Sequence, residues 1–256
     1  MRGVFCAIDD TLSTDGRLTA LTYAALERLR AAGKLVVPIT GRCAGWCDPI
    51  ARLWPVDAVV GENGAFYFRY DAAARRLVRR FLDDEATRSA QRARLAAVRD
   101  RILREVPGSA AAADQPWRET GLAIDVGEEV PRLSAAAIER VVAIMETSGL
   151  RATLGSTHVN GRFGHTDALA MTRTLMQEWF GVDLDQPGAR ADYVFVGASP
   201  GDAPLFAFFP YSVGVANVRD CLERMPAQPK FITTARCGAG FAELAEMIIR
   251  EGASNP

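Results

Sequence analysis

Short apolar runs alternate with amphipathic stretches near both ends of the chain. The N-terminal part has apolar runs at 4–8, 35–40 and 56–60, a helical pattern over 21–33, and a short helix after Gly41. After about residue 165 come helices over 166–181, 203–207 and 242–252 and strands at 193–197, 212–217 and 230–233. This alternation predicts an α/β fold, a Rossmann-like parallel sheet with helices on both faces.

The middle of the chain has a different pattern. It predicts a hairpin from 65–70 and 76–81, an Arg-rich helix over 84–106, strands at 122–126, 151–155 and 157–161, and a helix over 134–147. Acidic residues at both ends of the Arg-rich helix favour a solvated face over an anion-binding patch. We therefore expect an inserted α+β cap domain at 82–162 and a core domain formed by 1–81 and 163–256.

Composition narrows the class of partner. Apolar residues make up 49% of the 256, and 30 Lys and Arg against 31 Asp and Glu give a net charge of -1. Such a balance provides no general attraction to nucleic acid or to an anionic membrane, so we expect a small-molecule partner and predict no particular protein partner. The absence of a long apolar run or a leader segment predicts a cytoplasmic protein.

The five cysteines support that localisation, because an odd number in a chain of this size indicates reduced thiols. Cys43 and Cys47 stand four apart in a predicted helix, where a metal or redox pair is conceivable. Since no second Cys or His pair completes a tetrahedral site, we favour ordinary buried side chains.

Polar and small residues follow the predicted strands, where open parallel sheets bind their ligands. The first strand begins the stretch VFCAIDDTL at 4–12, the second ends in ITGR at 39–42, and the third is followed by ENG at 62–64. A later strand begins VFVGASPGD at 194–202. We expect these segments to converge at one edge of the sheet.

These segments resemble the motifs of the haloacid dehalogenase-like (HAD) phosphatases. The first segment matches the first motif, an apolar strand followed by D-x-D-[GD]-T-L, from Asp9 onward, and ITGR matches the second motif. The late strand matches the motif G-D-S-x-N-D at Gly197, Ser199 and Asp202. The third motif, a lysine that opens a helix seven residues before a leucine, aligns with Ala168, and His165 is a nearby alternative. The order of the motifs and the position of the cap make the chain similar, over nearly its whole length, to subfamily IIB. This subfamily includes sucrose-phosphate and mannosyl-phosphoglycerate phosphatases.

The resemblance implies roles for particular residues. The nucleophilic aspartate of the family falls on Ala7 and the acid/base aspartate on Asp9, while the lysine falls on Ala168. Phosphate would be held by Thr40, the backbone N–H of Gly41, and Arg42. The family's magnesium aspartate falls on Ala198, which leaves only Asp9 and Asp202 as remnants of the metal site.

Alanine cannot attack phosphorus or bind a hard cation, so we expect no cofactor, although the family uses magnesium. Taking Asp9 as a nucleophile in a shifted register would put Thr11 in the acid/base role, which it cannot fill near neutral pH. We therefore predict a pseudophosphatase that binds a sugar phosphate or similar anion.

Two alternatives remain open: a magnesium-dependent phosphatase inactivated artificially at these positions, and a metal-free sugar-modifying enzyme that uses Asp9. Ligand choice would lie in the cap, where His158, Asn160 and Arg162 are candidates, and where Trp117 and Arg118 are weaker ones. Ordinary packing or solvation is the simpler explanation for each of these side chains.

Overall fold

A computed structural model describes residues 1–155, 157–164 and 166–253. The chain divides into two compact units. The first unit contains Met1–Gly41, Cys47–Arg80 and Asp167–Pro256, and the second contains Arg42–Trp46 and Phe81–Thr166. That these units are the core and cap domains of a phosphatase remains a prediction.

The first unit is built around one large sheet. Within the described residues this sheet has eight strands, in the order β14-β13-β12-β1-β4-β5-β6-β7. They are β1 (Gly3–Ala7), β4 (Leu35–Ile39), β5 (Val59–Gly61), β6 (Phe66–Asp71), β7 (Arg76–Phe81), β12 (Tyr193–Gly197), β13 (Tyr211–Gly214) and β14 (Phe231–Ile232). Strands β14 to β5 pair in parallel, and β6 pairs antiparallel with β5.

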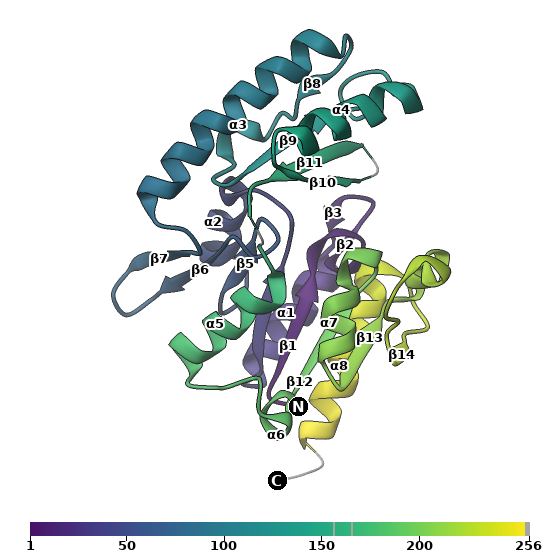
Figure 1. The fold of residues 1–256 in the computed structure, drawn as a ribbon. Helices are drawn as coiled ribbons and strands as arrows, with labels where there is room; N and C mark the ends of the chain where they lie inside the picture. Colours follow the sequence, from purple (N-terminus) through teal and green to yellow (C-terminus); the bar gives the residue numbers. More distant parts are fainter. Residues whose placement is uncertain (156, 165, 254–256) are drawn as a thin grey trace. The chain divides into compact units, whose positions relative to one another are not determined.

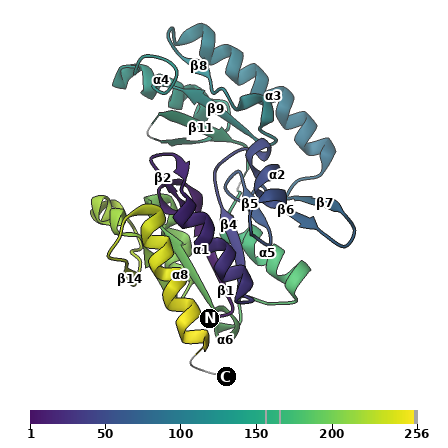
Figure 2. The same cartoon turned by 180° about the vertical axis from the view of Figure 1, so that it is seen from behind.

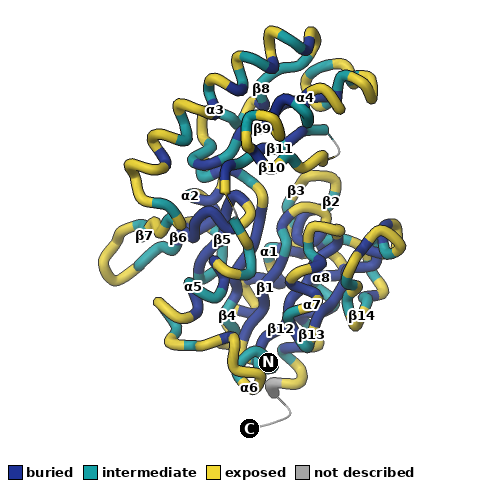
Figure 3. Tube along the Cα trace, viewed as in Figure 1, coloured by how far each residue is buried: buried dark blue, intermediate teal, exposed yellow. Residues whose placement is uncertain are grey.

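Helices cover both faces of this sheet. Figures 1 and 2 show α5 and α7 on one face and α1 and α8 on the other. The helices are α1 (Ala20–Ala31), α2 (Ala44–Leu53), α5 (Ala168–Phe180), α6 (Pro187–Arg190), α7 (Ala203–Phe208) and α8 (Cys237–Ala253). Because both faces are covered, the central strands are continuously apolar, and Figure 3 shows β1 in the buried interior. Val4, Phe5 and Cys6 of this strand are almost completely buried.

The second unit has its own sheet and its own core. Its four described strands are antiparallel in the order β10-β11-β9-β8. Its elements are α3 (Glu85–Glu105), β8 (Ala110–Ala111), β9 (Gly121–Asp125), α4 (Ala135–Thr147), β10 (Arg151–Leu154) and β11 (His158–Arg162). Leu122 and Ile124 of β9 pack with Ile102 of α3 and Val141 of α4 in one apolar cluster.

The predicted α/β class, with its large and mostly parallel sheet, is confirmed. The sequence pattern did not predict the two-residue strands β2 (Ser13–Thr14) and β3 (Arg17–Leu18) or the short helix α6. Elements of two to four residues are too short to show a periodicity. None of the helices in the described part of the chain is long and apolar enough to cross a membrane.

Candidate functional site

Three neighbouring parallel strands of the first unit end side by side. Ala7, the last residue of β1, pairs with Ile39, and Thr40 follows directly. On the other side of β1, Cys6 pairs with Val196, which places the end of β12 and the following Ala198 beside Ala7. We call this group, Ala7, Thr40 and Ala198, the strand-end site. The predicted convergence of the segments that follow β1, β4 and β12 is therefore observed.

The loop after β1 has an unusual backbone. Asp9 is extended (φ -68°, ψ 132°), whereas Asp10 has φ 55° in the left-handed region, and both are exposed. The N–H of Asp10 donates to Ser13 Oγ (3.1 Å), and its carbonyl accepts from Asn217 Nδ2 (2.9 Å). Asn217 Oδ1 in turn accepts the N–H of Cys237 at the start of α8 (2.8 Å).

Asn217 thus ties the aspartate loop to a helix more than two hundred residues away in sequence. No sequence motif pointed to this residue. Its only signal was its place at the end of the apolar run 212–217, where the other polar site residues also follow strands.

Thr40 is held between two strands. Its hydroxyl-bearing side chain is buried, its N–H donates to the carbonyl of Val60 (2.9 Å), and its carbonyl accepts from Asn63 N–H (3.0 Å). Gly41 packs so closely on Asn63 that a Cβ there would lie 3.0 Å from Asn63 Oδ1. The loop after β5 therefore positions Thr40 and Gly41 through both backbone and side chain.

That loop carries three successive left-handed residues, Glu62, Asn63 and Gly64, with φ of 44°, 55° and 96°. Positive φ costs energy for a residue with a Cβ, and such strain is common near functional sites. At Gly64 a Cβ would come within 2.4 Å of the carbonyl oxygen of Asp167. This loop therefore packs directly on the beginning of α5.

Ala168, the predicted lysine position, is the first residue of α5. Asp167 caps this helix by accepting the N–H of Leu169 (2.8 Å). Since Gly64 packs on Asp167 and Ala168, the third motif position lies against the loop that holds Thr40. His165, the alternative for this motif, lies outside the described residues.

The segment after β12 uses its remaining acid as a cap. Asp202 Oδ2 accepts the N–H groups of Ala198 (2.9 Å) and Ser199 (2.8 Å) and the Ser199 hydroxyl (2.9 Å). Burial raises the pKa of Asp202, and these donors offset only part of that effect. A Cβ at Gly197 would lie 2.6 Å from Asp202 Oδ2, so a larger residue here would displace the Asp202 side chain from this cap.

Arg42 belongs to the second unit, whereas Thr40 and Gly41 belong to the first. Its guanidinium lies over the ring of Trp46, 4.8 Å from the ring centroid. The three residues predicted to bind phosphate are thus not grouped in one compact unit.

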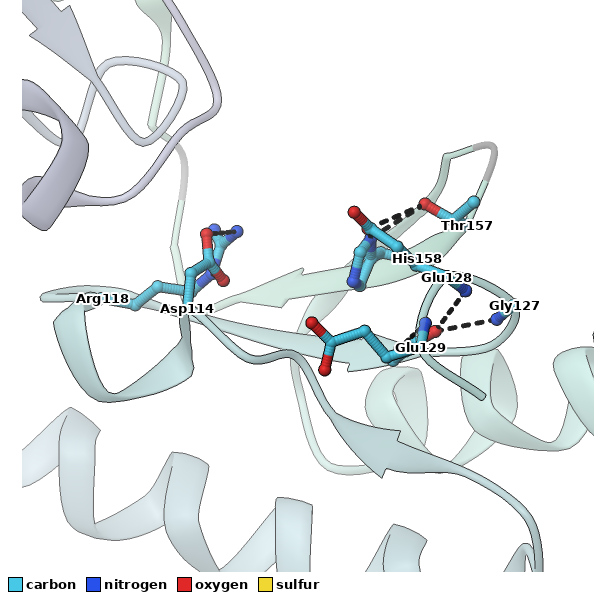
Figure 4. Close-up of polar contacts among 8 residues, drawn as sticks. Asp114, Arg118, Gly127, Glu128, Glu129, Thr157 and His158 are labelled. Carbon is cyan, nitrogen blue, oxygen red and sulfur yellow. Dashed lines mark hydrogen bonds and ion pairs between the residues drawn. The ribbon is translucent and has the colours of Figure 1, made fainter. Parts of the chain in front are cut away.

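Three of the candidates in the second unit share one face of β11. His158, Asn160 and Arg162 are half-buried and alternate with the fully buried Val159 and Gly161. Figure 4 shows His158 beside Thr157 and Glu128. Its Nδ1 lies 3.1 Å from Thr157 Oγ1 and 3.3 Å from Glu128 Oε2.

Asp125 of β9 pairs with His158 of β11, and its side chain is buried among hydrogen-bond donors. Burial opposes its ionisation, but the N–H groups of Glu128, Gly127 and Glu129 (each 2.8 Å) outweigh that effect. The pKa of Asp125 therefore lies below its usual value. This carboxylate fixes the loop that carries Glu128 toward His158.

The side chains of the strand-end site do not fit magnesium. Among the residues that the structure describes, no group of three or more His, Cys, Asp or Glu side chains is arranged to hold a metal ion. Ala7 and Ala198 offer methyl groups where a hard cation needs oxygen, and Asp202 Oδ2 already accepts three hydrogen bonds.

No protein-family model matches the sequence, and no curated protein matches it significantly. Solved structures do match, over almost the whole chain. A haloacid dehalogenase-like hydrolase from Bacteroides thetaiotaomicron is 12% identical, with a TM-score of 0.69 over 96% of this chain and 99% of that one. A trehalose-6-phosphate phosphatase related protein is 13% identical, with a TM-score of 0.67 over 99% of both chains. A HAD subclass IIB sugar phosphatase is 11% identical, with a TM-score of 0.62 over 97% and 99%.

Proposed function

We propose that this chain, which has the fold of the HAD superfamily phosphatases, is a pseudophosphatase. In this proposal the protein binds a sugar phosphate or a similar anion and does not hydrolyse it. The fold agrees with the resemblance seen in the sequence motifs.

One observation carries the proposal: Ala7 and Ala198 end adjacent parallel strands, β1 and β12, beside Thr40. Phosphoryl transfer to a protein requires a nucleophile, and a methyl group has no lone pair to attack phosphorus. The same two methyl groups cannot supply charge to a magnesium ion.

Thr40 and the neighbouring backbone support anion binding. The loop after β5 holds Thr40 and Gly41 in place, and hydroxyl and N–H groups at a strand end are suitable donors for phosphate. Without carboxylates at positions 7 and 198, the strand-end site repels an anion less than a site carrying two carboxylates would.

The names of two structural neighbours, a sugar phosphatase and a trehalose-6-phosphate phosphatase related protein, support a sugar phosphate as the ligand class. The polar face of β11, with His158, Asn160 and Arg162, is our candidate for sugar selection. The five free cysteines support the expected cytoplasmic localisation.

Two measurements test the proposal. Incubation of the protein with sugar phosphates in millimolar magnesium should release no phosphate above the level of an Asp9→Ala control. Calorimetry should detect binding of inorganic phosphate, and no stoichiometric binding of magnesium. Magnesium-dependent turnover that disappears in Asp9→Ala would disprove the pseudoenzyme proposal. Turnover by the wild type that needs no magnesium and disappears in Asp9→Ala would instead support a metal-free enzyme that uses Asp9.

A further inference from the structure

Two tryptophans of the second unit are largely exposed. Trp46 is 49% exposed and Trp117 is 60% exposed. A tryptophan that packs inside a protein buries about 150–250 Å², so both leave much apolar area in water. Exposed aromatic side chains held close together are characteristic of binding surfaces.

The two segments that carry these side chains are in direct contact. A Cβ added at Gly45 would lie 2.6 Å from Trp117 Cβ and 2.9 Å from Trp117 Cγ. The backbone just before Trp46 therefore presses against Trp117, which only a glycine at position 45 permits. Gly45 and Trp117 both belong to the second unit, so this contact lies within it.

Both segments are held by hydrogen bonds. Trp117 ends the short 3-10 helix Gln115–Trp117, and its N–H donates to the carbonyl of Asp114 (3.0 Å). The Gln115 side chain bridges to Gly121 O (3.0 Å) and Ala123 N–H (2.7 Å), which fixes this turn to β9.

The next residue, Arg118, strengthens the same turn. Its guanidinium makes two hydrogen bonds of 3.0 Å to Asp114 and is only 12% exposed (Figure 4). On the other segment, the N–H of Trp46 donates to the carbonyl of the buried Cys43 (3.0 Å). The tryptophans are thus exposed on ordered backbone, and ligand binding would require little further ordering.

A cation completes the group. The Arg42 guanidinium lies over the Trp46 ring, 4.8 Å from the ring centroid, where the ring face attracts the positive charge. An indole face packs well on the C–H face of a sugar ring, and a guanidinium donates to hydroxyl or phosphate oxygens.

We propose that Arg42, Trp46 and Trp117, here called the Arg–Trp surface, bind the sugar ring of a phosphorylated sugar. The inference rests on the proposed function for the class of ligand, and it adds the residues that recognise the sugar ring. The net charge of -1 makes a nucleic acid an unsuitable occupant, and the positive guanidinium matches an anionic sugar.

The test measures binding to the intact protein by calorimetry and by tryptophan fluorescence. The probes are glucose 6-phosphate, trehalose 6-phosphate, free trehalose, adenosine monophosphate and inorganic phosphate. Trp46→Ala and Trp117→Ala are the main variants. Leu82→Ala is the matched control, because Leu82 is an equally exposed apolar side chain of the same unit (49%).

We expect each tryptophan variant to weaken the binding of both sugar phosphates by about tenfold and to leave the Kd of inorganic phosphate unchanged. Leu82→Ala should change neither value. Gly45→Ala should also weaken sugar phosphate binding, because it displaces Trp117 without removing the indole. This variant keeps the test valid if a tryptophan variant folds poorly.

Unchanged affinity for sugar phosphates in all three variants would overturn the inference and leave the proposed function intact. Tighter binding of adenosine monophosphate than of either sugar phosphate would overturn it as well. If the wild-type protein binds neither phosphate nor sugar phosphate, the proposed function fails. In that case the Arg–Trp surface stands only if free trehalose changes the fluorescence through Trp46 and Trp117, and it falls if trehalose does not.

Discussion

The two halves of one sheet edge differ sharply. Beside β4, Thr40 and Gly41 keep polar donors, and the loop after β5 supports them through strained and closely packed residues. Beside β1 and β12, Ala7 and Ala198 carry only methyl groups. Strand pairing holds the backbone in both halves. Pairing and packing therefore hold the strand ends in place whether the side chains at their tips are polar or are single methyl groups.

Placing the family's two aspartates and its lysine at the aligned alanine positions should have the largest effect. Ala7→Asp, Ala168→Lys and Ala198→Asp together, with Gly201→Asn in the adjoining loop, should create magnesium binding and measurable release of phosphate from a sugar phosphate. Each substitution alone should do almost nothing, because a nucleophile, its cation and its neutralising lysine act as a unit.

Beryllium fluoride provides the readout for that experiment. With magnesium it should form a stable adduct on the carboxylate introduced in place of Ala7, and the unmodified chain should form none. A rebuilt protein that folds but shows no adduct, no magnesium binding and no turnover would show that the motif alignment is wrong, most directly at Ala168.

The loop after β5, which supports Thr40 and Gly41, should lose stability when one methyl group is added to it. Gly64→Ala places a Cβ at φ 96° and 2.4 Å from the Asp167 carbonyl, so we expect a loss of about 2–4 kcal/mol in the free energy of unfolding. Urea unfolding followed by circular dichroism measures it. Gly16→Ala is the control, since Gly16 also has a positive φ (72°) but has nothing within 4 Å of its Cβ position. Equal losses in both variants would mean that strain alone, and not packing on α5, matters at Gly64.

The anion-binding role of the intact half depends on one hydroxyl group. Thr40→Val keeps the shape of this buried side chain, and we expect it to weaken inorganic phosphate binding by about tenfold, the effect of losing one hydrogen bond to a charged group. Thr233→Val is the matched control, because it removes a buried hydroxyl that donates to Ala235 O in the same unit. Calorimetry that gives the same Kd for both variants would remove Thr40 from the site.

The smallest effect concerns the acid that remains beside β12. Because burial raises the pKa of Asp202 in the folded protein, its contribution to stability is full below the unfolded pKa, about 4, and is lost as pH rises through the folded pKa. Asp202→Asn keeps an acceptor for the N–H groups of Ala198 and Ser199 and cannot ionise. The stability of the wild type relative to this variant should therefore decrease as the pH rises from about 4 to neutral.

Urea unfolding of both proteins across that range gives the difference directly, at about 1.4 kcal/mol for each unit of pKa shift. An increase in the relative stability of the wild type with pH would mean that the N–H donors dominate over burial. In either case Asp202→Asn should leave phosphate affinity unchanged if Asp202 serves only as a cap.

Much of the fold follows from local patterns. The helix expected over 134–147 is α4 (Ala135–Thr147), and the strand expected at 193–197 is β12. Both have a clear period or an unbroken apolar run, which a window of ten or so residues contains. The strand expected at 230–233 shrinks to two residues, because β14 is an edge strand with a single partner.

The α/β alternation can be predicted from the residues alone, and so can the absence of carboxylates at positions 7 and 198, since folding cannot supply a side chain that is not encoded. Three contacts became visible only in the folded chain: Asn217 joins Asp10 to Cys237, Asp202 closes its own loop, and Gly45 packs on Trp117. Such contacts depend on which surfaces meet after the chain has packed, and the residues concerned are often far apart in sequence. Local periodicity contains no information about them.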